Sequence, residues 1–354
     1  MPLAPVDNKG TQLLYEDSGP LDGIPYTTMV IVHGSGYHSA IFHKMLPFAA
    51  QNQLRMVFVN RRDYPGSTPE SEEELKAIAP GATRESQSEF IATKGIELAG
   101  LLSWFIKTQG VPPVQTVDGK VKGGLVLVMW SSSNTALFGL LSHLDMVPED
   151  VRSTVGPYLR TCFHYDGPQW SSGFSKEDPY KVPFRDPSRS IEERTELLVN
   201  WLSGYYPHPD VASRSLEGLT NDIITESPDR TPTLKRMTPE EVEGVSCTAA
   251  LSGIDWYHRI VPQELYNEHM RKALFDEDMA AIWPHVKVKY VHGSQSLPEM
   301  VACLWDTEKV HGDIHAANGP LSGRTVEFHF IEGVNHYAHW DMPERFTSTL
   351  VELM

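Results

Sequence analysis

The chain has 354 residues and a formal net charge of −16, and 40% of its residues are hydrophobic. This length suffices for one large domain with an insertion, or for two closely associated domains. The acidic balance argues against binding to nucleic acid or to an anionic membrane surface. The sequence contains no stretch of about 18 uninterrupted apolar residues, so we expect no membrane span.

The N-terminal sequence has no basic segment followed by an apolar run, so we expect no signal peptide. The three cysteines, Cys162, Cys247 and Cys303, are far apart and odd in number. That usage is typical of a reducing compartment and of free thiols. We therefore expect a cytoplasmic protein.

Short apolar runs that stop at polar, glycine or proline residues predict buried strands in the first part of the chain. They lie at 27–32, 54–60 and 125–130, and a weaker alternating run at 12–19 predicts an edge strand. From about 83 to 108 the apolar residues take helical spacing, and the glycine and proline that follow predict the end of that helix.

The second half contains a long stretch without strand patterns. A strand is predicted at 160–165, after which residues 169–285 are rich in proline, tryptophan, tyrosine and charge and contain helix-like pieces. Strand patterns return at 286–291 and 325–331, and a last helix is predicted at 343–353.

This order of elements predicts a doubly wound, mostly parallel α/β sheet. We expect residues 1–168 and 286–354 to form the two parts of one core, and residues 169–285 to form a helical insertion. In open α/β sheets, ligands bind beyond the carboxyl ends of the strands. Residues that directly follow strands are therefore the first candidates for a site.

Four strand ends carry chemically informative residues. A His-Gly pair follows the first buried strand at 33–34, and three serines follow another at 131–133. Asp166 follows the strand at 160–165, and His336 ends the sequence Gly-Val-Asn-His after the last strand. This order of a His-Gly turn, a serine, an acid and a late histidine resembles the α/β-hydrolase superfamily.

The resemblance covers nearly the whole chain outside residues 169–285, which take the place of that superfamily's cap, or lid. The sequence "RRDYPGS" at 61–67 and the Trp-Ser pair followed by Asn at 130–134 look most like capped serine hydrolases of the fungal type. The chain is also similar to cofactor-free dioxygenases of the same fold. The resemblance implies no cofactor, and the spacing of the histidines indicates no metal site.

The three serines offer three registers for the nucleophile. The superfamily's elbow is a strained strand-to-helix turn that needs small residues two positions before and after the nucleophile. Ser132 would place Trp130 at the crowded preceding position. Ser133 has Ser131 and Thr135 as small neighbours, but it lengthens the strand.

Ser131 is the predicted nucleophile, with Ser133 as the alternative. In relatives the elbow reads Gly-Trp-Ser-x-Gly-Asn, and Trp130 and Asn134 stand at the matching positions here. Met129 and Ser133 replace the two glycines. The serines could also serve only as a cap for the helix that follows.

By resemblance, His336 is the general base, because Gly-x-x-His precedes the last helix. The usual position of the acid, after the seventh strand, holds Ser296. Some dehalogenases and the cofactor-free dioxygenases place the acid after the sixth strand, where this chain has Asp166. Asp166 is therefore the predicted acid, and Glu299, one helical turn beyond Ser296, is the alternative.

The oxyanion hole and the substrate pocket follow from the same resemblance. The backbone N–H groups of Ser35 and Ser132 are the expected oxyanion donors, and His33, Trp130 and Trp170 are candidate pocket residues. The insertion's aromatic side chains form either a pocket for a small apolar or aromatic substrate or the insertion's own core. They are Trp170, Trp201, Tyr205, Tyr206, Trp256 and Tyr257.

The predicted function is a serine esterase or lactonase that works through an acyl-enzyme. One alternative is a non-hydrolytic enzyme on this fold: a cofactor-free dioxygenase, a lyase or an acyltransferase. There His336 would deprotonate the substrate and Ser131 would position it. Another alternative is a ligand-binding protein without activity, since the elbow lacks its glycines. The sequence indicates no oligomeric state.

Overall fold

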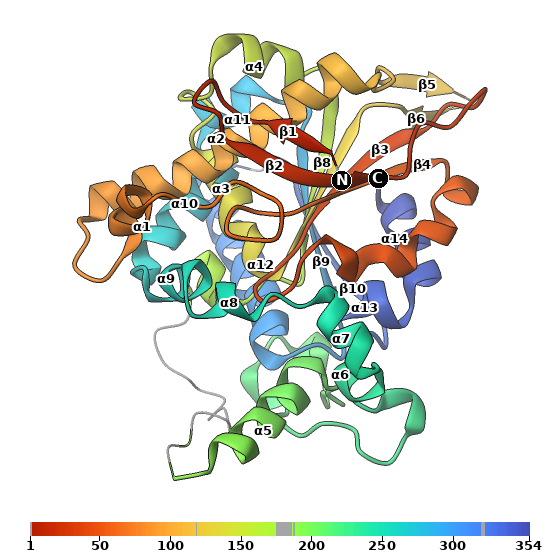
Figure 1. Cartoon of the computed structure of the whole chain (residues 1–354), viewed down its shortest axis with the longest axis vertical. Coiled ribbons are helices and arrows are strands. Elements are labelled where there is room, and N and C mark those ends of the chain that lie inside the picture. Colours follow the sequence, from red (N-terminus) through yellow and green to blue (C-terminus); the bar gives the residue numbers. More distant parts are fainter. Residues whose placement is uncertain (1, 118, 175–185, 187, 320–322) are drawn as a thin grey trace.

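An eight-stranded sheet forms the centre of the protein (Figure 1), in a computed structural model that describes residues 2–117, 119–174, 186, 188–319 and 323–354. The strand order is β1-β2-β4-β3-β7-β8-β9-β10. Pairing is parallel from β4 to β10, whereas β1 and β2 pair antiparallel. The strands are β1 (Leu3–Pro5), β2 (Gln12–Asp17), β3 (Thr27–Val32), β4 (Leu54–Val59), β7 (Leu125–Trp130), β8 (Leu159–Tyr165), β9 (Lys287–Gly293) and β10 (Val326–Ile331). A short hairpin of β5 (Gln115–Val117) and β6 (Lys120–Lys122) stands apart.

The predicted doubly wound α/β fold is confirmed. Every residue of β3, β4, β7 and β8 is buried, which explains why their sequences are continuous apolar runs. The prediction that 12–19 is an edge strand is wrong, because β1 pairs outside β2, with Leu3 opposite Leu14. Three residues are too few to give β1 a recognisable pattern.

Helices cover both faces of the sheet, so that the core has three layers. One apolar cluster joins the sheet to α2, α3, α10 and α12, and a second joins the other face to η1, α13 and α14. The helices outside the insertion are η1 (Ser39–Phe48), η2 (Ala50–Asn52), α1 (Glu72–Ile78), α2 (Arg84–Gln109), η3 (Ser131–Ser133), α3 (Asn134–Ser142), α4 (Glu149–Val155), α12 (Pro298–Asn318), α13 (Ala338–Asp341) and α14 (Pro343–Leu353).

Helix α2 shows how local sequence sets an element's ends. The Thr83 hydroxyl accepts a hydrogen bond from the Ser86 N–H at 3.2 Å and caps the N-terminus. Gly110 ends the helix in a left-handed conformation with φ of 66°. Both ends lie within two residues of the predicted ones, and α14 covers the 343–353 range predicted for it.

The insertion between β8 and β9 contains helices and loops but no strand among its described residues, and part of the 175–187 stretch lies outside them. Its elements are η4 (Gln169–Ser172), α5 (Ile191–Ser203), η6 (Val211–Ser213), η7 (Leu216–Gly218), η8 (Pro228–Arg230), α6 (Thr233–Arg236), α7 (Pro239–Val245), α8 (Thr248–Leu251), α9 (Ile254–Ile260), α10 (Gln263–Phe275) and α11 (Glu277–Ile282). Figure 1 shows α5, α6 and α7 beyond one end of the sheet, at the bottom of the view.

The insertion packs in two different ways. Met270, Ala273 and Leu274 of α10 belong to the apolar cluster that contains α2 and α3, so α10 is part of the helical layer on the sheet. Residues 191–260, which we call the cap segment, instead contact the loops at the carboxyl ends of the strands, as described below.

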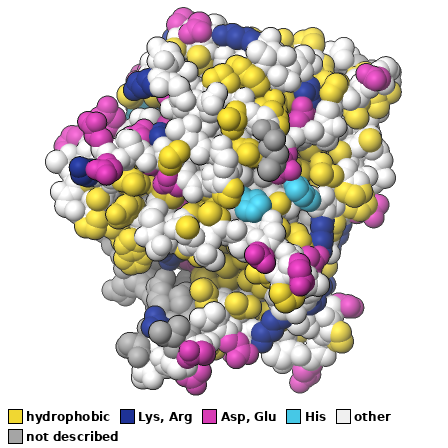
Figure 2. Space-filling model, in the orientation of Figure 1, with side chains coloured by type: hydrophobic (Ala, Val, Ile, Leu, Met, Phe, Trp, Pro, Cys, Tyr) yellow, Lys and Arg dark blue, Asp and Glu magenta, His cyan; other side chains and the backbone are white. Residues whose placement is uncertain are grey.

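The surface drawn in Figure 2 carries acidic and basic side chains interspersed with apolar ones rather than gathered in a single charged patch. Within the described residues, no helix combines the length and the hydrophobicity that crossing a membrane requires.

Candidate active site

Ser131 occupies the turn between β7 and α3 with a left-handed backbone. Its φ is 57°, and Ser132 and Ser133 are absent from the few described non-glycine residues with positive φ. A β-carbon makes this conformation costly for any residue but glycine, so the surrounding structure must enforce it. A strained serine between a strand and a helix is the geometry of a nucleophile elbow.

The other two serines are committed to structural contacts. The Ser133 hydroxyl is 1% exposed and donates to the carbonyl oxygens of Trp130 at 2.8 Å and Val32 at 3.2 Å. The Ser132 hydroxyl accepts a hydrogen bond from Ser35 Oγ at 2.8 Å. Ser131 is the most exposed of the three, which favours it as the group that meets a substrate.

The loop after β3 lies directly against the elbow. A β-carbon built at Gly34 would stand 2.7 Å from Ser131 Cβ and 3.3 Å from Ser131 Oγ. Only glycine allows this approach. Together with the hydrogen bond between Ser35 and Ser132, the contact places both expected oxyanion donors beside Ser131.

Gly34→Ala should therefore reduce turnover of a small activated ester by roughly 10- to 100-fold, because an added methyl pushes the loop away from Ser131. Steady-state kinetics of the folded variant measure this. Gly244→Ala is the matched control, since nothing lies within 4 Å of a β-carbon built at Gly244. Equal activity in both variants would show that the close approach has no role.

The structure brings His336 and Asp166 together. Nδ1 of His336 lies 2.5 Å from Oδ2 of Asp166, and the two residues are 2% and 0% exposed. The imidazole is fixed from its other side by Trp130, whose ring centroid is 4.9 Å away and whose indole N–H donates to the His336 carbonyl at 3.1 Å. Because Trp130 directly precedes Ser131, this contact holds the histidine next to the elbow.

The Asp166 carboxylate accepts two further hydrogen bonds, which favour its charged form. The Gly293 N–H donates to Oδ1 at 3.1 Å and the Ser296 hydroxyl donates to Oδ2 at 2.5 Å. Burial by itself would raise the pKa of Asp166, but the hydrogen bond and charge of His336, with His292 and Ser296, outweigh it and hold the pKa below its usual value. Asp166 can thus remain a carboxylate that orients the imidazole.

Ser296 is a residue whose part the sequence did not reveal. It stands at the position where the resemblance places the acid, and the sequence suggested only that a charge is missing there. In the structure its hydroxyl donates to Asp166, the predicted acid. Glu299, the alternative acid, lies in the first turn of α12. Burial raises the pKa of Tyr206 and the nearby charge of Glu299 adds to that shift, whereas Nδ1 of His336 is taken by Asp166.

The three candidate pocket residues have different surroundings. His33 is fully buried, with Nδ1 2.8 Å from the Gly34 carbonyl and Nε2 3.1 Å from the Arg61 N–H. Burial, followed by the charge of Arg61, lowers its pKa well below 6.5, so the ring is neutral and braces two backbone segments. Trp130 packs on His336, as described, while Trp170 packs on Tyr266.

The insertion's aromatic side chains have several different surroundings. Trp201 and Tyr206 form a small apolar cluster with Leu297 and Met300, which is a core role. The Tyr205 hydroxyl donates to Asp341 at 2.6 Å. Trp256 is 53% exposed. None of these contacts places an aromatic ring of the insertion against Ser131.

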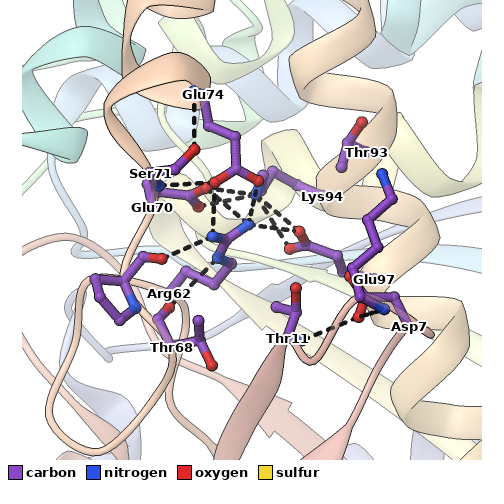
Figure 3. Close-up of polar contacts among 12 residues, drawn as sticks. Asp7, Thr11, Arg62, Thr68, Glu70, Ser71, Glu74, Thr93, Lys94 and Glu97 are labelled. Carbon is purple, nitrogen blue, oxygen red and sulfur yellow. Dashed lines mark hydrogen bonds and ion pairs between the residues drawn. The ribbon is translucent and has the colours of Figure 1, made fainter.

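A mostly buried group of five charged residues, in which the Glu74 side chain is 34% exposed, is centred on Arg62 (Figure 3). The Arg62 guanidinium stands between the carboxylates of Glu70, Glu74 and Glu97, at 2.9, 2.6 and 2.9 Å, and Lys94 bridges Glu70 and Glu97 at 2.8 and 3.0 Å. Three carboxylates face two cations, so the group carries one excess negative charge when all are ionised. A buried excess charge is costly, and binding one proton removes it.

Glu70 is the carboxyl that takes this proton. Burial raises its pKa from 4.5 to about 7, Lys94 opposes the shift and Glu97 adds to it. The carboxyl lines a cavity of about 60 Å³ that also meets Ser133, Ile254 and His258. The cavity therefore extends from the charged group to η3, which contains Ser133, and to α9 of the cap segment.

The folded protein should lose stability as the pH rises from about 4.5 to about 7. In this range folded Glu70 keeps a proton that the unfolded chain has released, so the folded state binds more protons and the free energy of unfolding falls. Glu70→Gln cannot ionise. Its stability relative to the wild type should increase by roughly 2 kcal/mol between about pH 5 and pH 8 in urea unfolding.

Glu73→Gln, at an exposed carboxyl in the first turn of α1, provides the comparison. A difference between Glu70→Gln and wild type that stays constant with pH would show that Glu70 has an ordinary pKa.

No known family model matches this chain, and no curated protein matches its sequence. Solved structures do match. A laboratory-evolved variant of potato epoxide hydrolase matches 99% of this chain and 98% of its own, at 11% identity and a TM-score of 0.52. A carboxylesterase of the thaumarchaeon Nitrososphaera gargenis matches 99% and 97%, at 10% identity and a TM-score of 0.50.

A third solved structure, of a protein that recognises the Pseudomonas quinolone signal and cleaves its ring, matches 100% of this chain and 99% of its own, at 14% identity and a TM-score of 0.50. At such identities the likeness concerns the fold rather than the chemistry. These proteins are α/β-hydrolase fold members, and the strand order and three-layer core agree with them. The chain therefore has the α/β-hydrolase fold.

Proposed function

We propose that this protein is a serine hydrolase that cleaves a carboxylic ester or lactone with Ser131, His336 and Asp166. The observation that carries the proposal is the left-handed Ser131, packed against Gly34 at the end of β7 and beside a buried His336–Asp166 pair. A structural serine has no need of such a backbone. Backbone strain of this kind clusters at active sites.

In the proposed reaction, Ser131 Oγ attacks the carbonyl carbon and passes its proton to Nε2 of His336. Asp166 keeps the Nδ1 proton in place and stabilises the imidazolium that forms. The N–H groups of Ser35 and Ser132 stabilise the oxyanion. His336 then protonates the leaving alkoxide, and water hydrolyses the acyl-enzyme by the same steps in reverse.

The substrate is proposed to be small and apolar or aromatic, and part of the insertion is proposed to cover it. The cap segment contacts both loops that flank Ser131. Asp255 accepts a hydrogen bond from Gly36 at 3.1 Å, and Asn335, next to His336, donates to the Ser203 carbonyl at 2.9 Å. We infer that residues 191–260 form the lid, with α10 part of the core, although the sequence assigned all of 169–285 to the cap.

Rapid mixing with an activated aryl ester tests the proposal. An acyl-enzyme mechanism should give an initial burst of the released phenol, equal in amount to the enzyme, when deacylation is slower than acylation. The absence of both a burst and steady turnover over a series of short-chain esters and lactones would argue against a hydrolase.

A cofactor-free dioxygenase is the second candidate, because the acid follows β8, the sixth strand of the main sheet, as in the dioxygenases that the sequence resembles. In that reaction His336 would remove a proton from the substrate and Ser131 would position it. Measurement of oxygen uptake with a hydroxylated quinolone separates the two candidates. Uptake without any ester turnover would replace the first proposal by the second.

A further inference from the structure

A carboxylate of the cap segment reaches the loop that lies against the elbow. Asp255 of α9 is 3% exposed, and its Oδ2 accepts hydrogen bonds from the Gly36 N–H at 3.1 Å and the Tyr64 hydroxyl at 2.5 Å. Its Oδ1 pairs with Nη2 of Arg61 at 2.9 Å. Arg61 and Tyr64 belong to the segment after β4. We call Arg61, Tyr64 and Asp255 the clamp.

The clamp holds the loop on both sides of Ser35. Nη2 of Arg61 donates to the Gly34 carbonyl at 3.1 Å, and the Gly36 N–H donates to the Tyr64 hydroxyl at 2.9 Å. Burial raises the pKa of Tyr64 far above its usual value, so this hydroxyl keeps its proton and can donate a hydrogen bond to Asp255.

The Gly34 carbonyl and the Ser35 N–H belong to one peptide unit. In a planar trans peptide the C=O and the N–H point in opposite directions, so fixing one fixes the other. Nη2 of Arg61 donates a hydrogen bond to this carbonyl oxygen, and Nδ1 of His33 lies 2.8 Å from the same oxygen. The orientation of the Ser35 N–H is thus set by groups that bind the opposite end of its own peptide.

The cap segment also pairs with this loop through the backbone. The Cys247 N–H donates to the Gly36 carbonyl at 2.8 Å, and the His38 N–H donates to the Val245 carbonyl at 3.0 Å. Tyr37 and Ser246 form the β-bridge between these bonds. The loop is therefore held from the core by Arg61 and Tyr64 and from the cap by Asp255 and residues 245–247.

We propose that Asp255 is a positioning residue: by holding Arg61, Tyr64 and Gly36 together, it keeps the Ser35 N–H aimed at the oxyanion. This inference rests on the proposed hydrolase function. It means that the cap helps to assemble the catalytic geometry as well as covering the substrate. A cap displaced from the loop would leave Ser131 and His336 in place with a misdirected oxyanion donor.

Asp255→Asn is the informative substitution, because an amide has nearly the same shape. Its single oxygen cannot both pair with Arg61 and accept from Gly36 and Tyr64, and its NH2 group faces a donor whichever way it turns. The loop should loosen while the fold persists. Asp229→Asn, at an exposed carboxylate of the cap segment, is the matched control.

The first measurement is steady-state kinetics with a small activated ester, with active sites counted by fluorophosphonate titration so that misfolded protein is excluded. Asp255→Asn should lower kcat by roughly 10- to 100-fold and change KM by less than about threefold, because oxyanion donors act in the transition state. Asp229→Asn should match the wild type. An unchanged kcat, or a rise in KM alone, would overturn the positioning role.

The second measurement is amide hydrogen exchange, which needs no substrate. In Asp255→Asn, exchange in the peptide covering residues 33–38 should be at least about tenfold faster than in the wild type. Unchanged exchange there would overturn the inference. If the wild type neither hydrolyses esters nor reacts with the fluorophosphonate, the proposed function fails, and the exchange result still decides whether Asp255 holds the loop.

Tyr64→Phe provides a second variant should Asp255→Asn not fold. It keeps the ring that packs on His33 at 4.2 Å and removes the hydroxyl that links Gly36 to Asp255. A smaller fall in kcat, again with little change in KM, is expected. Activity equal to the wild type would contradict the clamp.

Discussion

Ser131→Ala should abolish hydrolysis of a small activated ester, with a loss of roughly 10⁴-fold or more in kcat. The reason is that Ser131 alone of the three serines combines a left-handed backbone with a partly exposed side chain beside Gly34. The fold should persist, because the substitution removes one partly exposed oxygen. Steady-state kinetics at high enzyme concentration and a thermal melt measure both quantities.

Ser133→Ala is the control for the register of the elbow. Its hydroxyl donates only to the carbonyl oxygens of Trp130 and Val32, so the substitution should cost about 1 kcal/mol of stability and reduce kcat by no more than about tenfold. If Ser133→Ala were inactive and Ser131→Ala retained activity, the nucleophile would be Ser133.

Asp166→Asn should lower kcat by about 10⁴-fold while the protein still folds. An asparagine at this position can keep its carbonyl oxygen toward the Gly293 N–H, but its NH2 group then meets Nδ1 of His336 and the Ser296 hydroxyl. The imidazole would be forced into the wrong tautomer, and its cation would lose its stabilising charge. Turnover measured across a range of pH, with a melt of each variant, tests this.

Glu299→Gln is the matched control for the acid and should keep most of the activity. Glu299 lies near Tyr206, while Asp166 occupies Nδ1 of His336. Loss of activity in Glu299→Gln with retention in Asp166→Asn would identify Glu299 as the acid and would contradict the geometry described here.

The fold could be predicted because its signals are local. Strands buried on both faces require continuous apolar runs, and β3, β4, β7 and β8 show them. The pairing of Asp166 with His336 also followed from the sequence, through the resemblance and the absence of a charge at Ser296, although 170 positions separate the two residues.

The contacts that shape the site could not be predicted, because they join distant segments through ordinary residues. Asp255 meets Gly36 across 219 positions, in an insertion where a carboxylate normally means a solvated surface. Nothing in the sequence around Ser296 indicates that its hydroxyl binds Asp166. Most aromatic side chains of the insertion were equally ambiguous, since Trp201 and Tyr206 pack into a small core of the kind that any helical segment needs.

Reaction with a fluorophosphonate, followed by peptide mass mapping of the modified residue, tests whether Ser131 is the nucleophile. We expect one equivalent of label, attached to Ser131, in the wild type and none in Ser131→Ala. Labelling should be slow in Asp166→Asn, because His336 then accepts the serine proton poorly. Label on Ser132 or Ser133, or a wild-type protein that does not react at all, would contradict this assignment.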